Sequence, residues 1–224
     1  MKRFLAVLFF LSPIFFSCDR EIEVPNSNSG FSFFPFLIGN YWIYEVDERI
    51  YFGENDFEDR SFYYRDLIRT VYVDDAGEQV FIVQRDWSSD QESWTFETEY
   101  TLVVRGQNLI MNLNNSPIVV LAFPIQDGLM WDGNRFRDAV RDDFQIELET
   151  PISSENVRLK VIQEEADDLI TFRDKRYDVF EENVGLIERY YEVLTYCSRN
   201  DCLGDQLIDS GKFVHMRLIR SGNE

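Results

Sequence analysis

Histidine and lysine are scarce in this chain, and each scarcity excludes a kind of site. The 224 residues contain one histidine, His215, and only four lysines among 22 basic residues. A zinc site with His-x-x-x-His spacing is therefore absent, and a lysine-based catalyst has few candidates. One histidine suffices for a Ser-His-Asp triad, but the Gly-x-Ser-x-Gly turn of such enzymes is missing, as is a glycine-rich phosphate loop. We predict that His215 lies on the solvent side of a strand, and we assign no metal or cofactor.

The N-terminal apolar run is too short to span a membrane as a helix. It covers residues 4–16, about 13 residues, whereas a spanning helix needs roughly 20. It follows Met1-Lys2-Arg3 and ends at Ser17-Cys18, before a polar stretch. This order is typical of a lipoprotein signal that is removed on maturation. We predict a signal peptide at 1–17 and lipidation of Cys18. A plain secretion signal and an uncleaved anchor are the alternatives.

Positive charge is also in short supply. If cleavage precedes Cys18, 207 of the 224 residues remain, with 20 basic residues against 41 acidic ones. Such a surface repels nucleic acid and anionic headgroups, so we expect no nucleic-acid partner. The expected membrane contact is the lipid anchor, because a diacylglycerol and an amide-linked acyl chain supply more than the single chain that binds only marginally.

Apolar residues are nearly missing from the segment after Cys18. Residues 19–30 are charged and then read Pro-Asn-Ser-Asn-Ser-Gly, a composition that favours a flexible tether. We therefore divide the chain into a signal peptide at 1–17, a lipidated cysteine and tether at 18–33, and a single β domain at 34–224. The tether has a root-mean-square reach of roughly 20 Å, which keeps the domain near the membrane.

Cysteine is limited to three residues, which become an even pair once Cys18 is lipidated. Cys197 and Cys202 are separated by four residues, which is not the spacing of a redox pair. In an oxidising compartment two such cysteines are typical of a disulfide that closes a loop. We predict this disulfide rather than a metal or redox site.

Helix signals are weak, and the dominant hydrophobic period is two. Trp42, Tyr44 and Val46 alternate with polar positions, as do Val214, Met216 and Leu218. This alternation indicates half-buried antiparallel strands. We expect ten to twelve strands and one short helical turn at 134–142. The expected strands lie near 40–52, 62–74, 79–87, 93–105, 107–113, 117–123, 143–150, 156–165, 168–173, 176–182, 185–197 and 212–220.

A repeat suggests how these strands are organised. Two segments, 89 residues apart, share the pattern Phe-Pro-x-x-x-Gly-x-x-Trp. The first consists of Phe34, Pro35, Gly39 and Trp42, and the second of Phe123, Pro124, Gly128 and Trp131. Proline fixes φ, glycine permits a turn with positive φ, and tryptophan supplies a large buried anchor. We predict an all-β domain with an antiparallel curved sheet, an open barrel or a sandwich built from two similar halves. Two unrelated glycine turns are the alternative.

The chain resembles a group of poorly characterised lipoproteins of Bacteroidota-type bacteria. The resemblance rests on the first Phe-Pro-x-x-x-Gly-Asn-x-Trp-x-Tyr segment, on 184–187 and on the cysteine-closed loop. It implies an envelope address and a fold, and no reaction. Residues 19–23 also resemble the acidic segment of surface-exported lipoproteins in such bacteria. An aspartate after the lipidated cysteine signals inner-membrane retention in enteric-type bacteria, but the whole chain fits the first group better. We therefore expect outer-membrane anchoring, on the periplasmic or the surface face.

Three further patterns are non-specific. Forty-one carboxylates guarantee some pair at glycosidase-like separation, so that spacing carries no weight. Residues 86–92 resemble a calcium loop, but Gln91 replaces the glycine of an EF-hand, which favours a polar hairpin. Exposed aromatic side chains on a sheet stack on sugars or anchor partners, although strand propensity explains them equally well. The candidates are Tyr41, Tyr63, Tyr64, Trp87, Tyr190 and Tyr191.

Together these features predict a non-enzymatic envelope lipoprotein that acts as a binding or accessory subunit, with an envelope protein as its partner. The first alternative is a carrier of lipids or hydrophobic ligands, which requires a large apolar cavity in a half-barrel. The second is a surface glycan-binding or hydrolytic protein, which requires convergent polar groups in a cleft.

Overall fold

The computed structural model describes residues 31–53, 56–149 and 156–224. In these residues a 3-10 turn, η2 (Phe31–Phe33), precedes twelve strands in one antiparallel sheet. The strands are β1 (Asn40–Gly53), β2 (Asp56–Val73), β3 (Gln79–Ser88), β4 (Thr95–Arg105), β5 (Asn108–Leu113), β6 (Ser116–Ala122), β7 (Met130–Asp132), β8 (Asp143–Glu149), β9 (Arg158–Asp167), β10 (Phe172–Glu181), β11 (Gly185–Tyr196) and β12 (Ile208–Asn223).

The sheet consists of two six-stranded meanders joined by β1 and β12. Its order is β6-β5-β4-β3-β2-β1-β12-β11-β10-β9-β8-β7. The two outer strands approach each other, because the Val119 N–H of β6 donates to the Gly133 carbonyl just after β7, at 2.9 Å. The sheet is thus a nearly closed, barrel-like structure, and the predicted all-β antiparallel fold is confirmed.

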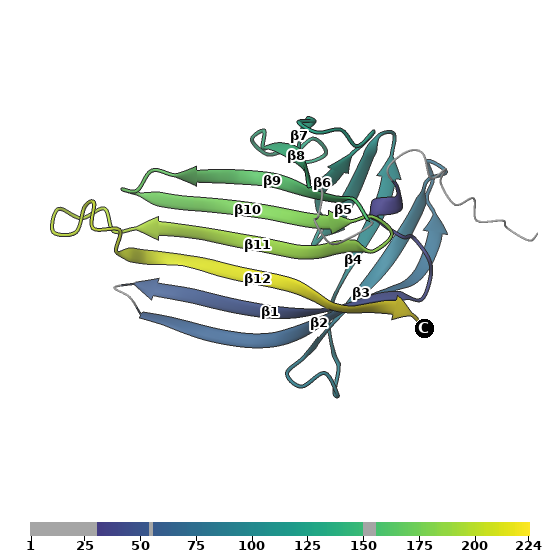
Figure 1. Cartoon of the computed structure of the whole chain (residues 1–224), viewed down its shortest axis with the longest axis horizontal. Helices are drawn as coiled ribbons and strands as arrows, with labels where there is room; N and C mark the ends of the chain where they lie inside the picture. Colours follow the sequence, from purple (N-terminus) through teal and green to yellow (C-terminus); the bar gives the residue numbers. More distant parts are fainter. Residues whose placement is uncertain (1–30, 54–55, 150–155) are drawn as a thin grey trace, which may run out of the picture.

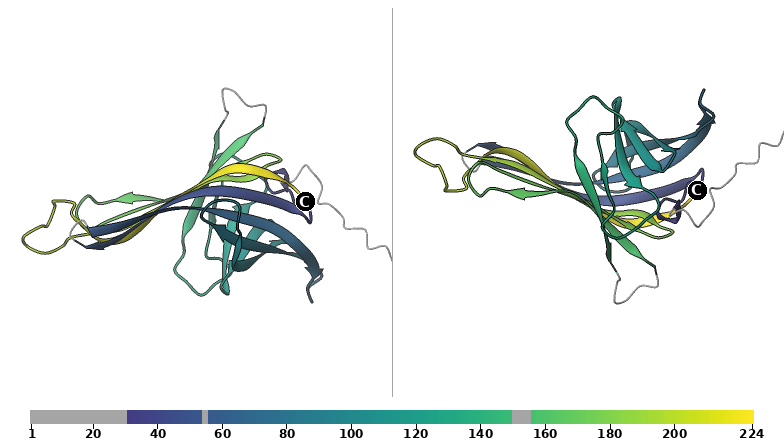
Figure 2. Two further views of the ribbon diagram at one scale, coloured as in Figure 1. Left: turned by 90° about the horizontal axis from the view of Figure 1, so that it is seen from below. Right: turned by 90° about the horizontal axis from the view of Figure 1, so that it is seen from above.

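The long strands extend beyond the part of the barrel that holds the core. Figure 1 shows β1, β2 and β9–β12 running side by side toward one end of the molecule. Seen edge-on in Figure 2, the sheet is a single layer at that end, and it is covered by further strands at the other end. We call the face of the long strands that carries Trp42 and Val46 the core face, and the opposite face, which carries Asp47 and Arg49, the outer face.

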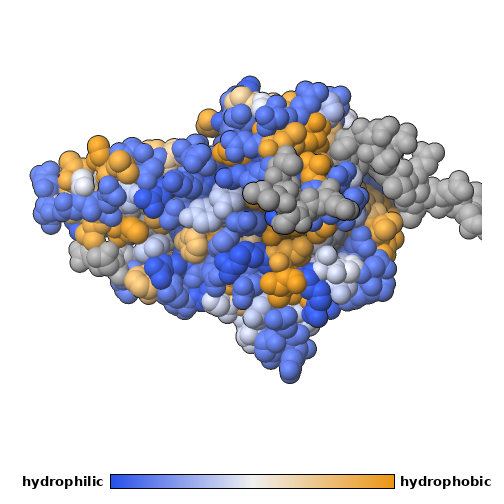
Figure 3. Space-filling view, in the orientation of Figure 1, coloured by the Kyte–Doolittle hydropathy of each residue, from blue (hydrophilic) through white to orange (hydrophobic). Residues whose placement is uncertain are grey.

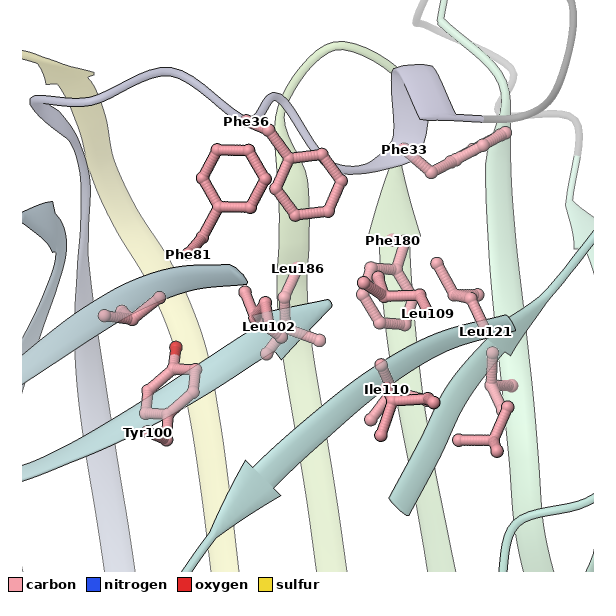
Figure 4. Close-up of a cluster of buried hydrophobic side chains, with 14 of the residues drawn as sticks. Phe33, Phe36, Phe81, Tyr100, Leu102, Leu109, Ile110, Leu121, Phe180 and Leu186 are labelled. Atoms are coloured by element: carbon pink, nitrogen blue, oxygen red, sulfur yellow. The ribbon is translucent and has the colours of Figure 1, made fainter. Parts of the chain in front are cut away.

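The hydrophobic core is tightly packed where β3–β6 cross the long strands. Figure 4 shows labelled core side chains, among them Phe81, Leu109 and Phe180, between the crossing strands. Side chains with no exposed surface include Val46, Ile68, Val83, Leu109, Val119, Leu121, Phe144, Ile146 and Leu159. These side chains fill the part of the barrel in which they lie at the density of an ordinary protein core.

The two Phe-Pro-x-x-x-Gly-x-x-Trp segments make the same turn. Gly39 and Gly128 both have positive φ, at 89° and 74°. Their N–H groups donate to Ile68 of β2 and Ile146 of β8, at 2.9 and 2.8 Å. Each segment therefore leads into the first strand of its meander and bonds to the second.

The tryptophans of the two segments also make the same kind of hydrogen bond. The indole N–H of Trp42 donates to the Val184 carbonyl at 2.6 Å, and that of Trp131 donates to the Val119 carbonyl at 2.9 Å. Both rings are buried. The repeat seen in the sequence is thus a repeat of hydrogen bonds in the structure.

The structure differs from the predicted elements at several places. One strand, β10, replaces the two expected at 168–173 and 176–182: it contains 176–181, whereas residues 168–171 form the turn before it. The short strand β7 was not predicted, and 133–139 form turns and bends rather than a helix. Phe33, which the sequence assigns to the tether, is buried in the core. Turn residues and short strands lack a full period of alternation, which explains these differences.

Candidate functional site

The free end of the long strands is the first candidate site. Three connections meet there: β1 to β2, β9 to β10, and β11 to β12 (Figure 1). They are adjacent because the order of these strands in the sheet is β2-β1-β12-β11-β10-β9. We call this end, with Phe52, Phe57, residues 168–172 and residues 197–207, the distal tip. The described chain begins at η2, which lies at the opposite end of the molecule (Figure 1).

Large apolar side chains are exposed at the distal tip. Six of them are between 43% and 60% exposed: Phe52, Phe57, Leu169, Ile170, Phe172 and Leu203. Figure 3 shows apolar surface at this end among hydrophilic residues. Single exposed apolar residues are ordinary, but their concentration on three neighbouring turns is typical of an interaction surface.

The turn before β10 holds two of these side chains outward. The Asp168 carboxylate accepts hydrogen bonds from the Ile170, Thr171 and Phe172 N–H groups, at 2.6 to 3.0 Å. The pKa of Asp168 lies well below its usual value. The hydrogen bond from the Thr171 hydroxyl is the largest cause, and these N–H bonds add to it. Leu169 has a φ of 60°, in the left-handed region, which costs an ordinary residue roughly 1 kcal/mol. An exposed leucine in that conformation is not explained by folding stability.

The loop between β11 and β12 presents Leu203. Cys197 and Cys202 form a disulfide across this loop, and both are buried. The Leu203 N–H donates to the Arg199 carbonyl at 2.9 Å, and the Cys197 N–H donates to the Leu207 carbonyl at 2.7 Å. The disulfide that the sequence predicts thus holds the turn from which Leu203 projects.

Removing this disulfide is expected to destabilise the protein modestly. The double substitution Cys197→Ser and Cys202→Ser should lower the free energy of unfolding by about 2 kcal/mol, since the loop it closes is small. Urea denaturation measures the change, and reduction of the unsubstituted protein should produce the same shift. An unchanged unfolding midpoint in both cases would contradict the role of the disulfide.

The rim of the distal tip is acidic. Exposed carboxylates lie at the start of β2 and on the other two connections, at Asp56, Glu58, Asp168, Asp201 and Asp205. Some are balanced locally, as in the Arg60–Glu58 pair at 2.9 Å. The excess of carboxylates matches the acidic chain as a whole, which carries a formal charge of −19. The surface of a partner that binds the tip should therefore be apolar with basic residues around it.

His215 lies on the outer face, as predicted, between two charged neighbours. Its Nε2 is 2.9 Å from Glu188 Oε1, and its Nδ1 is 2.8 Å from Arg217 Nη1. Both ring nitrogens are thus engaged, and no serine hydroxyl bonds to the ring in the described chain. This arrangement is that of a surface ion-pair network and does not assemble a catalytic triad.

A row of aromatic rings crosses the outer face beside His215. Tyr177 and Tyr190 stack with centroids 5.1 Å apart and planes within 3°. Lys160 covers the far side of Tyr177 at 4.2 Å, and Phe213 meets Tyr190 edge-on at 5.5 Å. The pKa of Tyr190 is raised to about 12, mainly by burial and then by the charge of Glu192. Because the ring faces are covered by neighbours, this row stabilises the sheet and leaves no platform for a sugar.

The six candidate aromatics do not form one surface. Tyr64 and Trp87 lie directly opposite each other on the core face, whereas Tyr63 pairs with Ser88 on the outer face. Tyr190 and Tyr191 project from opposite faces of β11, and Tyr41 packs beside Gly222. The structure therefore brings together only Tyr64 and Trp87.

The calcium-like segment 86–92 uses its carboxylates internally. Asp86 is buried and pairs with Arg65 at 2.8 Å. Asp90 accepts hydrogen bonds from the N–H groups of Glu92 and Ser93, at 2.9 and 3.0 Å. These bonds lower the pKa of Asp90, and the bond from Ser93 is the largest cause. The segment is a polar hairpin connection. Elsewhere, Cys197, Asp201 and Cys202 lie close together, but the disulfide occupies both sulfur atoms and precludes a metal.

Two buried ion pairs on the core face were missed by the sequence analysis. Asp66 bonds to Arg85 at 2.7 and 2.6 Å, and Asp178 bonds to Arg189 at 2.7 Å through both oxygens. Both aspartates are almost fully buried. Each interrupts a run of alternating apolar residues, as Asp66 does within 62–68, and that interruption is the signal that was available.

The phenol of Tyr100 completes the first of these pairs. Its hydroxyl donates to Asp66 at 3.0 Å, and burial, followed by the charge of Asp66, raises its pKa. The cluster is internally satisfied and holds no nucleophile beside a base, so it does not form a catalytic site.

Cys18 lies outside the described residues, as do the rest of the predicted signal peptide and residues 19–30 of the predicted tether. The lipid anchor therefore remains a prediction from the sequence. In the part of the chain that the structure describes, no helix combines the length and the apolar character needed to cross a membrane.

Comparisons with known proteins identify no family for this chain. No family model matches it, and no curated protein matches it. Solved structures with a similar fold include a protein from Bacteroides fragilis described as exported and YmcC-like in fold, with 9% identity and a TM-score of 0.41. Another is a protein from Parabacteroides distasonis described as a lipoprotein, with 11% identity and a TM-score of 0.40. Each likeness covers 85% of this chain and 98% of the other. Likeness at this level carries no conclusion about function.

Proposed function

We propose that this protein is a non-enzymatic lipoprotein of the bacterial outer membrane, anchored through Cys18, that binds an envelope protein through its distal tip. The observation that carries the proposal is the exposure of six large apolar side chains on three adjacent strand connections and the strand ends beside them. Keeping such a cluster in water costs free energy, which a partner that covers it would recover.

The position of the tip supports contact with a partner rather than with the anchoring membrane. The described chain begins with η2 at the opposite end of the molecule (Figure 1). A tether with a reach of roughly 20 Å leaves the long strands free to point away from the membrane. The acidic rim also disfavours anionic headgroups. A protein with an apolar patch and surrounding lysines or arginines fits this surface better.

Site-specific photo-crosslinking tests the proposal. A benzophenone amino acid at position 169 or 203 should crosslink one discrete envelope protein in living cells, whereas the same group at the highly exposed position 140 should not. The crosslinked peptide of that protein should contain basic residues around the contact. Adducts with lipid alone, or with a second copy of this chain, would contradict the proposal.

Loss-of-contact variants provide the matched control. Leu169→Asn with Ile170→Ser should abolish the crosslink from position 203 without lowering the unfolding temperature, because asparagine tolerates the left-handed backbone. Val140→Ser removes a similar apolar side chain away from the tip and should leave the crosslink unchanged. Equal crosslinking in the two variants would count against the tip as the contact.

A further inference from the structure

A cavity of about 600 Å³ opens on the core face, where the long strands leave the core. Its aromatic wall consists of Phe62 and Tyr64 on β2 and Trp87 on β3. The Phe62 ring lies 5.0 Å from that of Tyr64 and 6.3 Å from that of Trp87. Trp87 is 38% exposed, although tryptophan is usually well buried. The volume is in the range of sites that take small ligands.

Polar groups of this wall are available to a ligand. Trp42 and Trp131 each donate their indole N–H to a backbone carbonyl, whereas the Trp87 indole has no such partner in the described residues. The Tyr64 hydroxyl likewise makes no hydrogen bond there. The pKa of Tyr64 is raised, and burial is the largest cause. The charge of Arg85 opposes this shift and nearby carboxylates add to it, so the phenol keeps its proton and can donate. The half-buried Tyr64 hydroxyl and the exposed Trp87 N–H can therefore both donate to a bound molecule.

The charges around the cavity balance one another. Lys212 bonds to Glu48 at 2.6 Å, and Arg60 bonds to Glu58 at 2.9 Å. Glu97 also lines the cavity and makes no ion pair within the described part of the chain. Beneath the wall, the Arg85 guanidinium lies 4.6 Å from the Tyr64 ring centroid and is neutralised by Asp66. An anionic ligand would therefore find both basic groups already paired, whereas the Glu97 carboxylate stays free to accept hydrogen bonds.

We infer that this cavity binds a neutral saccharide. The rings of Trp87 and Tyr64 offer surfaces for the apolar C–H face of a sugar. The Trp87 N–H and the Tyr64 hydroxyl are donors for its oxygen atoms, and the Glu97 carboxylate is an acceptor for its hydroxyls. This site is separate from the distal tip, and the inference does not depend on the proposed protein partner.

Titration with defined sugars tests the inference. Cellotriose, maltotriose and chitotriose serve as neutral probes, with citrate and spermidine as anionic and cationic probes. In 1H–15N spectra of the folded domain, at least one trisaccharide should shift the indole signal of Trp87 and leave those of the buried Trp42 and Trp131 in place. Shifts caused only by citrate or spermidine, or by no probe, would overturn the inference.

Substitutions then assign the binding to the cavity. Trp87→Ala should weaken binding of the active trisaccharide about tenfold, as measured by saturation-transfer NMR. Trp94→Ala removes an indole that lies beside Arg65 instead, and it should leave the affinity unchanged. Tyr64→Phe deletes only the hydroxyl and provides a second, conservative test in case Trp87→Ala impairs folding. Wild-type affinity in both cavity variants would refute the site.

Discussion

Replacing Arg189 with alanine is expected to lower the free energy of unfolding by about 3–5 kcal/mol. The substitution removes two hydrogen bonds of 2.7 Å and leaves the Asp178 carboxylate, which is 1% exposed, without its counter-charge. Burial alone would lower the pKa of Arg189, but the charge and hydrogen bonds of Asp178 raise it above its usual value, so Arg189 stays charged. Since domains of this kind are stable by about 5–15 kcal/mol, the loss should be visible as a large fall in the urea midpoint.

Two control variants separate the buried charge from the loss of an arginine as such. Arg49→Ala breaks an ion pair with Asp59 that lies on the exposed surface, and we expect no measurable change in the urea midpoint. Arg189→Met together with Asp178→Leu removes both charges and should recover most of the lost stability, because no uncompensated charge remains. If Arg189→Ala and Arg49→Ala behave alike, the assignment of a buried pair is wrong.

Replacing Cys18 with alanine is expected to release the protein from the membrane almost completely. The predicted acyl chains would be lost with this residue, and the excess of acidic residues disfavours binding to an anionic surface. In cell fractionation, the substituted protein should be found in the soluble or secreted fraction instead of the membrane pellet. Mass spectrometry of the unsubstituted protein should find an acylated Cys18 as its first residue.

A second variant controls for effects on folding. Ser17→Ala keeps a small residue before the cysteine and should leave the membrane fraction unchanged. Purified Cys18→Ala protein should retain the unfolding midpoint of the acylated form, because the anchor lies outside the β domain. Membrane association that persists in Cys18→Ala would contradict lipid anchoring, and it would also remove the basis for placing the distal tip away from the membrane.

Much of the fold follows from local patterns. Alternation along 40–52 and 93–105 predicts strands that the structure confirms as β1 and β4, since each side chain's face is set by a period of two. The shared glycine positions of the two motifs predict turns, and both glycines have positive φ. The boundary between the expected strands at 168–173 and 176–182 was wrong because polar residues within β10 resemble a turn in composition.

The candidate sites depended on information that alternation does not contain. Tyr64 and Trp87 are 23 positions apart, and only the register between β2 and β3 places them side by side. The β1–β2 connection precedes the other two connections of the distal tip by more than a hundred residues, and only the order of the strands in the sheet brings all three to one end. Strand order and register result from contacts between distant segments, which a local period does not specify.

By itself, the sequence determined that this is an acidic, strand-rich chain with one pair of cysteines suited to a loop disulfide, and it predicts a lipoprotein-type leader, because each of these properties is local. Only the tertiary structure decided which face of each strand is buried against the barrel, that two aspartates there are neutralised by arginines, and that three turns expose apolar side chains together. These are consequences of packing, where a residue's environment is created by neighbours that are far away along the chain.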